Sequence, residues 1–346
     1  MKEFITKENN LVKKNWSQLG TKKIIIILLD AIFVFSTFIC AFIDYVNDGR
    51  FFGYLLALSF VGIGILVILP WGHRFTTYEK TWFLTILVLA SIFSILFPEE
   101  DMHGIKGVWI MALYLLNTFL NILCELLIAK QSKWNFIVSV FVELSEILIY
   151  GLLAYRFATM AVTIFFWLPI DVLSFIAWHR HPDKYKNELT QVRTLTGKQE
   201  VLIIIGIIVW TVVVGYILTL IDLGSELFHG NDKLEIAVCY IDACVSAVGI
   251  ANGIFILFRI REQWVAWFIY ALLEGVINIL AGQYVLLISK LGYLTNTTYG
   301  YIRWTKYIKE NPEMLIKGED LKLKTIIAKT KANIANLKEK RAKKSA

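Results

Sequence analysis

The sequence predicts an all-α membrane protein that crosses the bilayer many times. Of its 346 residues, 57% are hydrophobic and only 18% are charged, and the mean hydropathy is +0.61. These values lie outside the range of soluble globular domains. Long apolar segments recur along the chain, and the Lys and Arg residues gather in alternate connections between them. This alternation is the positive-inside pattern of polytopic membrane proteins.

Apolar segments that approach the roughly 20 residues needed to cross the hydrocarbon predict ten spans. They are 24–46, 51–70, 82–97, 107–129, 135–155, 159–178, 201–221, 236–258, 264–282 and 285–304. If both termini are cytoplasmic, 30 of the 35 Lys and Arg residues lie on the cytoplasmic side. The opposite connections are acidic instead, with Glu99, Glu100 and Asp101 in one of them. An odd number of spans would place one basic tail outside, so we expect a multi-pass protein of the cell membrane with both termini in the cytoplasm.

The two ends of the chain are predicted to be cytosolic tails. Residues 1–23 are polar and Lys-rich and lack the pattern of a cleaved signal peptide. Residues 305–346 are basic, and we expect either a helix lying on anionic lipid or a solvated tail. The net charge of +7 follows from this topology, so nucleic acid is not an expected partner.

Motifs of catalysis and metal binding are not found in the sequence. The four cysteines lie in apolar segments without CxxC spacing, which indicates neither a disulfide framework nor a zinc site. There is no HExxH, no GxSxG and no pair of His residues at ligand spacing. We therefore expect no enzyme and no cofactor.

Two stretches of the chain resemble each other. ELLIAKQSKWNF (125–136) ends a span in a basic turn and a Trp, and Trp178 closes a later span. FILFRIREQWVAWF (255–268) repeats this order, with Trp304 as the closing residue. Both copies run from outside to inside, so one further span must separate them. The sequence thus predicts a three-helix bundle at 107–181, a linking helix at 200–222 and a second three-helix bundle at 235–304, preceded by additional N-terminal helices at 24–97.

Three motifs in these repeats point to a family. FFWLPIDVLSFIAWHRH (165–181) has a Pro, a polar residue two positions later and an aromatic run that closes on Trp and cations. EQWVAWF (262–268) has a WxxW entry to a span, and TTYGYIRW (297–304) has a Tyr-Gly-Tyr-x-x-Trp ending. In order and spacing they resemble the PnuC family of nicotinamide riboside (vitamin precursor) transporters.

This resemblance implies a SWEET-like fold of two parallel three-helix bundles joined by a linking helix. It also implies a homotrimer that lets a vitamin-like substrate diffuse down its gradient, with trapping by cytosolic phosphorylation. Relatives in the family carry thiamine or riboflavin. The chain departs from the family pattern at Asp171, where Gln is usual, at Ser174, where Gly is usual, and at Ala271, where Asn is common. We expect these differences to affect the substrate and not the fold.

Polar side chains within the spans predict a substrate cavity. A charged residue at mid-membrane costs about 2.5–3.5 kcal/mol on insertion scales and normally faces a bundle interior or a watery cavity. Glu274, Asn278 and Trp267 share one helical face. Further candidates for substrate contact lie in other spans and in the last motif: Asp171, Glu143, Asp242, Asn121 and Tyr301. For other charged groups the alternative is pairing within the protein: Lys290 with one of these carboxylates, and Glu146 or Glu125 with Arg156 or Lys130 near an interface.

An acidic cavity with a Trp wall suits a cationic substrate. The face of a Trp ring attracts a desolvated cation by about 2 kcal/mol, and carboxylates offset a permanent positive charge. Nicotinamide riboside and thiamine carry such a charge, whereas riboflavin is neutral. We therefore predict a facilitator (uniporter) for a small cationic vitamin precursor, with nicotinamide riboside first and thiamine as the alternative. Proton-coupled transport is a further alternative, because membrane carboxylates also serve as proton relays.

Overall fold

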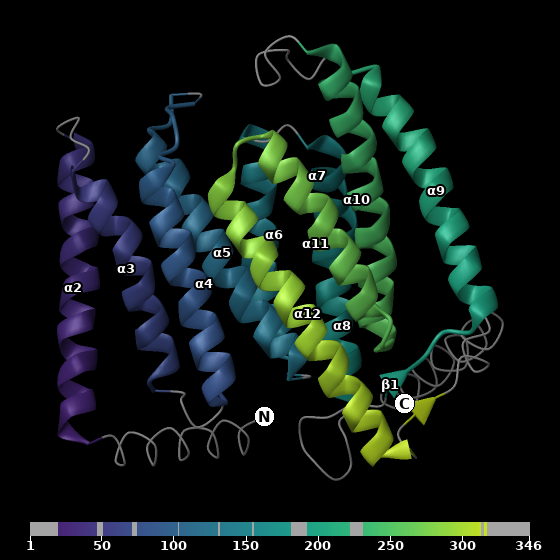
Figure 1. Cartoon of the computed structure of the whole chain (residues 1–346), viewed down its shortest axis with the longest axis horizontal. Coiled ribbons are helices and arrows are strands. Elements are labelled where there is room, and N and C mark those ends of the chain that lie inside the picture. The colour runs from purple at the N-terminus through teal and green to yellow at the C-terminus, as the bar shows by residue number, and fades with distance from the viewer. Residues whose placement is uncertain are drawn as a thin grey trace, which may run out of the picture.

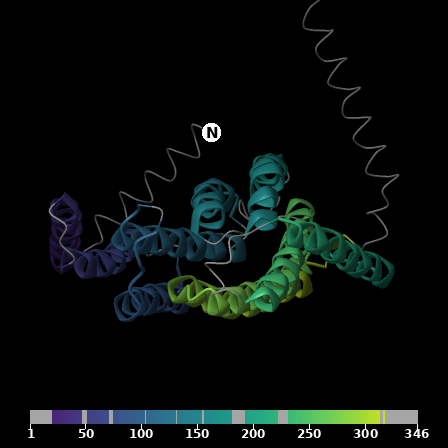
Figure 2. The ribbon, with the colours of Figure 1, turned by 90° about the horizontal axis from the view of Figure 1, so that it is seen from above.

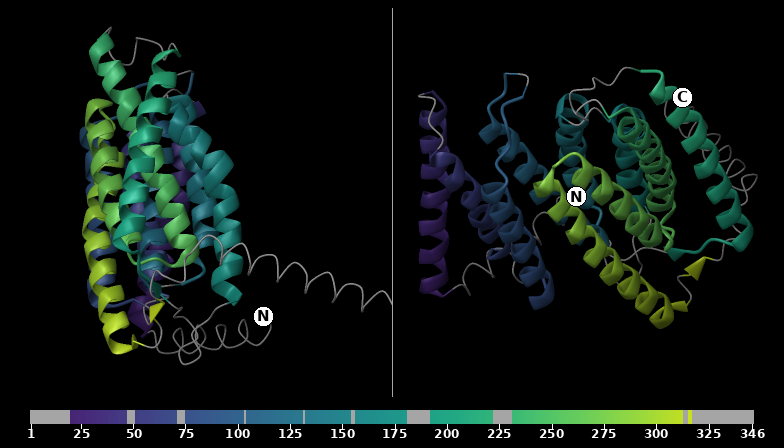
Figure 3. Two further views of the ribbon diagram at one scale, coloured as in Figure 1. Left: turned by 90° about the vertical axis from the view of Figure 1, so that its right-hand side faces the viewer. Right: turned by 45° about the horizontal axis from the view of Figure 1, so that its top comes forward.

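A computed structural model describes residues 20–46, 51–70, 75–102, 104–130, 132–153, 156–180, 192–221, 231–312 and 315–316. The predicted tails lie almost entirely outside these residues. The described part is helical apart from one pair of two-residue strands, β1 (Val192–Arg193) and β2 (Leu315–Ile316), which pair in parallel. The helices lie alongside one another over much of their length (Figure 3).

The helices follow the predicted spans in order. They are α2 (Thr21–Val46), α3 (Phe51–Ile68), α4 (Thr77–Leu96), α5 (Gly107–Ala129), α6 (Asn135–Leu148), α7 (Phe157–Val162), α8 (Leu168–Arg180), α9 (Gly197–Thr219), α10 (Asp232–Phe258), α11 (Gln263–Leu280) and α12 (Tyr284–Glu310). A π-helical segment, η1 (Ile149–Leu153), extends α6, and a second one, η2 (Thr163–Trp167), joins α7 to α8.

Eight of the described helical segments are long and apolar enough to cross a membrane. The predicted span at 51–70 is a shorter apolar helix, Gly53–Ile68. The α12 helix is long enough to cross a membrane but is not apolar enough. The α12 helix is long but polar, since it carries Lys290, Asn296 and Thr297, and all three are buried. The prediction of ten apolar spans is therefore too simple at α12, which carries buried polar side chains between neighbouring helices.

Neighbouring helices pack in a continuous series from one edge of the molecule to the other (Figure 1). The α2 helix packs on α3, α3 on α4 and α5, and α4 on α5 and α12. The central group is formed by α5, α6, α8, α10, α11 and α12, with α12 against α5 and α10 against α7 and α8. Seen from above, α2 lies at one edge and α9 near the other (Figure 2).

The additional N-terminal helices are fixed to the central group by a buried carboxylate. Glu79 lies in the first turn of α4, where it completes a capping box with Thr76. Its side chain is fully buried and contacts Lys130 Nζ at 2.9 Å and Arg303 Nη1 at 3.0 Å. Because two cations from other helices meet this charge, Glu79 links α4 to the end of α5 and to α12.

Candidate functional site

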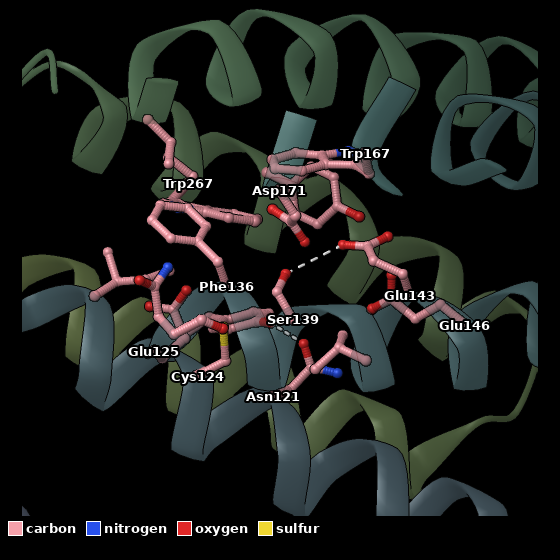
Figure 4. A pocket seen from close by; sticks show the side chains of 16 residues that line it. Asn121, Cys124, Glu125, Phe136, Ser139, Glu143, Glu146, Trp167, Asp171 and Trp267 are labelled. Carbon is pink, nitrogen blue, oxygen red and sulfur yellow. Dashed lines mark hydrogen bonds between the residues drawn. The ribbon is translucent and has the colours of Figure 1, made fainter. Parts of the chain in front are cut away.

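An enclosed pocket lies in the middle of the central group of helices, with residues of α5, α6, η2, α8, α10, α11 and α12 around it (Figure 4). Its volume is about 30 Å³. That is enough for water but far below the 300–1,000 Å³ of typical small-molecule sites. A larger molecule can enter only after side chains or helices around the pocket have moved.

The lining of the pocket is strongly acidic. Four carboxylates contribute to it: Glu125, Glu143, Glu146 and Asp171. No described Lys or Arg is among the lining residues. All four side chains are buried. A buried carboxylate is costly when no cation or hydrogen-bond donor compensates it. The pocket is therefore suited to a positively charged occupant.

Hydrogen bonds satisfy the carboxylates only in part. Ser139 Oγ lies 3.4 Å from one oxygen of Glu143, and the other oxygen has no partner among the described residues. Asp171 points toward the same place (Figure 4), and its Oδ2 atom is also without a described partner. Glu125 accepts a 2.9 Å bond from Asn296 Nδ2. Two carboxylate oxygens that could accept hydrogen bonds thus remain unbonded where Glu143 and Asp171 approach each other.

Aromatic rings form a second part of the lining. Trp267 lies between Trp167, with ring centroids 5.8 Å apart, and Tyr293, at 5.6 Å, and both neighbours are nearly parallel to it. Tyr270 meets the edge of Trp267 at 5.2 Å. Faces of aromatic rings attract cations, so these rings complement the carboxylates chemically.

Local sequence explains how Trp167 and Asp171 reach the pocket together. Pro169 lacks an N–H group and its ring crowds the preceding turn, which disturbs an ordinary α-helix. The chain adopts the wider π-helical turn η2 immediately before it. Such π-bulges recur at functional sites because they redirect side chains. Trp167 and Asp171 are four residues apart, and both line the pocket.

A network of ion pairs lies beside the pocket. Arg156 precedes α7 and contacts Asp242 of α10 at 3.2 Å and also Glu274 of α11. Lys290 of α12 lies 2.7 Å from the second oxygen of Glu274. The Thr159 hydroxyl also donates to Asp242. Two cations and two carboxylates balance each other here, and all four are buried.

The predicted site residues divide between these two places and the rest of the molecule. Asp171, Glu143, Trp267 and Asn121 line the pocket together. Asn121 accepts a hydrogen bond from the Tyr293 hydroxyl and donates to Asn117 Oδ1 at 2.9 Å. These four come from α5, α6, α8 and α11, so helices distant in the sequence converge at the pocket.

Four other predicted residues lie outside the pocket lining. Glu274 and Asp242 belong to the ion-pair network, where protein cations already neutralise the charge that was assigned to a substrate. Asn278 is buried, but its amide atoms have no partner among the described residues. Tyr301 is 37% exposed and lies 5.5 Å from the Arg261 guanidinium. Glu274, Asp242 and Asn278 are buried within the bundle, as expected of polar residues in a span, whereas Tyr301 is exposed.

Pairing predictions for the other charged groups were partly wrong. Lys290 pairs with a carboxylate as expected. Arg156 pairs with Asp242 and Glu274, and Lys130 pairs with Glu79, so neither forms its ion pair with Glu125 or Glu146. Both glutamates line the pocket instead.

Some lining residues were not singled out from the sequence. Trp167, Tyr270 and Tyr293 complete the aromatic part of the pocket. For Trp167, the signal was its position two residues before Pro169 and four before Asp171. Among the described residues, no cluster of His, Cys, Asp and Glu has the arrangement of a metal site.

Comparisons with known proteins agree with this architecture. The chain is 24% identical over 267 residues to the "Nicotinamide riboside transporter PnuC" of Neisseria mucosa, covering 72% of this chain and 90% of that protein. A solved structure described as "Crystal structure of the Vitamin B3 transporter PnuC" has the same fold, with a TM-score of 0.52 and 23% identity over 68% of this chain and 94% of that one. The descriptions name transporters, in agreement with the prediction that the chain is not an enzyme.

The family comparison covers both predicted bundles and the helix between them. The model of the family described as nicotinamide mononucleotide transporter matches residues 111–306. This range contains the pocket and the ion-pair network and leaves out α2, α3 and α4. The resemblance seen in the motifs is thereby confirmed. The chain is a multi-pass membrane protein and belongs to the nicotinamide mononucleotide transporter family.

Proposed function

We propose that this protein is a transmembrane facilitator for nicotinamide riboside, a small cationic vitamin precursor. The observation that carries the proposal is the buried pocket with four carboxylates, no basic side chain and a wall of Trp and Tyr rings. The named activity of the Neisseria mucosa relative supports the same substrate. In this proposal Asp171 and Glu143 provide counter-charge, and Asn121 bonds to ribose or amide groups. Trp267 stacks on the pyridinium ring once one of the two rings that flank it has moved aside.

Electrostatics favours a cation at this place. Unpaired buried carboxylates are unfavourable until a positive charge joins them, and an aromatic face adds about 2 kcal/mol for a desolvated cation. A membrane potential that is negative inside favours entry by about 2.3 kcal/mol per elementary charge and 100 mV. The negative-inside potential can therefore drive uptake of a cation without a second coupled ion.

Transport requires the pocket to open to each side in turn. At about 30 Å³ the pocket is closed, and rearrangement of the two three-helix bundles would enlarge it. The Arg156 network joins the first bundle to the second, because its partners Asp242, Glu274 and Lys290 all belong to the second. We propose a SWEET-like 3+1+3 arrangement, in which this network holds the bundles together at the extracellular side of the pocket. Glu274, Asp242 and Asn278 then act in the transport cycle through helix contacts, and Tyr301 lies at the cytoplasmic end.

The topology and assembly are part of the same proposal. Positive charge at the ends of α5, α10 and α12 supports cytoplasmic termini. We propose a homotrimer and trapping of the substrate by cytosolic phosphorylation, following the family resemblance. Native mass spectrometry in detergent tests the trimer, and a mass matching one or two copies would contradict it.

Two alternatives follow from the same pocket. Thiamine also carries a positive ring and suits the carboxylates. Proton-coupled transport is favoured by one observation: Asp171 and Glu143 approach each other and form no ion pair with a described Lys or Arg. Such carboxylates can carry a proton through a transporter. The facilitator needs no proton gradient, and this difference separates the two mechanisms.

Binding and uptake measurements test these proposals. Purified protein is heated with nicotinamide riboside, thiamine or riboflavin, because a ligand that binds the folded state stabilises it by RT ln(1 + [L]/Kd). We expect stabilisation by nicotinamide riboside; stabilisation by thiamine alone would reassign the substrate, and by riboflavin alone would contradict the electrostatic argument. Uptake into proteoliposomes is then measured with and without a proton gradient at constant membrane potential. Loss of uptake without the gradient would identify proton coupling.

A further inference from the structure

The turn between α10 and α11 contains an arginine in an unusual backbone conformation. Arg259 has φ +58°, and it is the only non-glycine residue with positive φ among the described residues. The N–H groups of Arg259 and Ile260 bond to the carbonyls of Ile256 at 3.0 Å and Phe255 at 2.8 Å. This is the Schellman pattern of a helix end, whose left-handed position is usually glycine. The backbone alone favours glycine here, so a reason for arginine lies in its side chain.

Two further arginines belong to the same turn. The Arg193 N–H of β1 donates to the Arg259 carbonyl at 2.9 Å, and the Arg261 N–H donates to the Arg193 carbonyl at 2.9 Å. The nearby carboxylate of Glu262 is already engaged: it lies 2.8 Å from Arg261 Nη2 and accepts from the Leu195 N–H at 3.2 Å. Three arginines thus meet at this turn, and Glu262 forms an ion pair with Arg261.

The Arg259 side chain is buried, and it forms no ion pair with a carboxylate of the described residues. It is 4% exposed, and its Nε and Nη1 atoms have no hydrogen-bond partner among the described residues. Burial, and then the charge of Arg193, lowers the pKa of Arg259 to about 10. The guanidinium still carries its charge at pH 7. Buried donors of this kind are costly when they remain unpaired.

We propose that Arg259 is the centre of an anion site that binds a phosphate group. The planar guanidinium offers paired donors that match phosphate oxygens, and the Nε and Nη1 donors of Arg259 are unbonded among the described residues. The phosphate belongs either to the headgroup of an anionic lipid or to a soluble phosphate compound. The site lies one helical turn from the pocket, because Ile256 lines the pocket three residues before Arg259.

The test uses the full-length protein, purified in an uncharged detergent. Inorganic phosphate is titrated in one arm, and phosphatidylglycerol in mixed micelles is titrated against phosphatidylcholine in the other. Thermal stabilisation gives the affinity in each arm. The variant Arg259→Gly suits the left-handed backbone and removes the guanidinium, and Arg259→Gln removes the charge but keeps a side chain. The control Lys309→Gln removes one charge from an exposed position on α12.

Wild-type protein should be stabilised in at least one arm, and both Arg259 variants should bind about tenfold more weakly or worse. Lys309→Gln should behave like the wild type. A response to phosphatidylglycerol alone identifies a lipid headgroup, and a response to inorganic phosphate identifies a soluble ligand. No stabilisation of the wild type in either arm would overturn the proposal. Equal affinity in wild type and both Arg259 variants would overturn it as well.

Discussion

Removing the negative charge of Glu274 should destabilise the protein strongly. Glu274 is 1% exposed and contacts both Lys290, at 2.7 Å, and Arg156. In Glu274→Gln, Lys290 loses its ion pair and Arg156 keeps the one with Asp242, and breaking a buried pair in this way costs about 3–5 kcal/mol. Lys290→Met leaves an excess of one negative charge in the network and should reduce stability by a similar amount. The double variant has one cation and one carboxylate, so its charges balance again.

The double variant is therefore the informative one. We expect it to be more stable than the sum of the single effects predicts, by about 1–3 kcal/mol. Unfolding of the purified proteins in detergent, followed by Trp fluorescence, measures these differences. Glu310→Gln is the control, because the Lys306–Glu310 pair is exposed and 3.8 Å long, and it should change stability by less than about 0.5 kcal/mol. Additive effects, or a Glu274→Gln variant with wild-type stability and lost substrate binding, would refute the network and favour direct substrate contact.

Two further predictions concern a loop and a helix contact. Burial raises the pKa of Glu99 to about 7, so the folded state holds its proton more tightly than the unfolded state does. The contribution of Glu99 to stability should therefore be lost as pH rises from about 4.5 to about 7. In thermal melts Glu99→Gln should show a smaller loss of stability over this range than the wild type, and an unchanged pH profile would contradict the assignment. Gly300→Ala should destabilise the protein by about 1–3 kcal/mol, because the added Cβ atom would lie 2.5 Å from the Trp264 ring. In the control Gly206→Ala the added Cβ atom would meet no atom within 4 Å, so stability should not fall. Equal stability of the two variants would contradict this packing.

Much of the helical architecture could be predicted from the sequence. The bilayer sets the length of the apolar segments and the alternation of basic connections, so both can be recognised in the sequence without knowledge of the tertiary structure. The α12 helix is the exception, because Lys290 and Asn296 are stabilised by partners on other helices and lower its hydropathy. Neither partner is visible from α12 alone.

The site could be predicted only in part. Asp171, Glu143 and Trp267 were identifiable because polar or aromatic groups within a span have few other places to go. Glu274 and Asp242 gave the same signal, but Arg156, expected near an interface, is buried between them. Helical periodicity shows which residues share a face of one helix, but it does not show which helix packs against that face. For this reason the sequence could not distinguish a carboxylate that is available to a cationic substrate from one that is already paired with a Lys or Arg of the protein.

The central claim is that the unpaired carboxylates of the pocket bind the substrate's positive charge. Its most direct test is the affinity of purified wild type and Asp171→Asn for nicotinamide riboside, with Asp232→Asn, an exposed position at the start of α10, as the control. We predict that Asp171→Asn binds about tenfold more weakly or worse, while Asp232→Asn binds like the wild type. Equal affinity in all three proteins would contradict the claim.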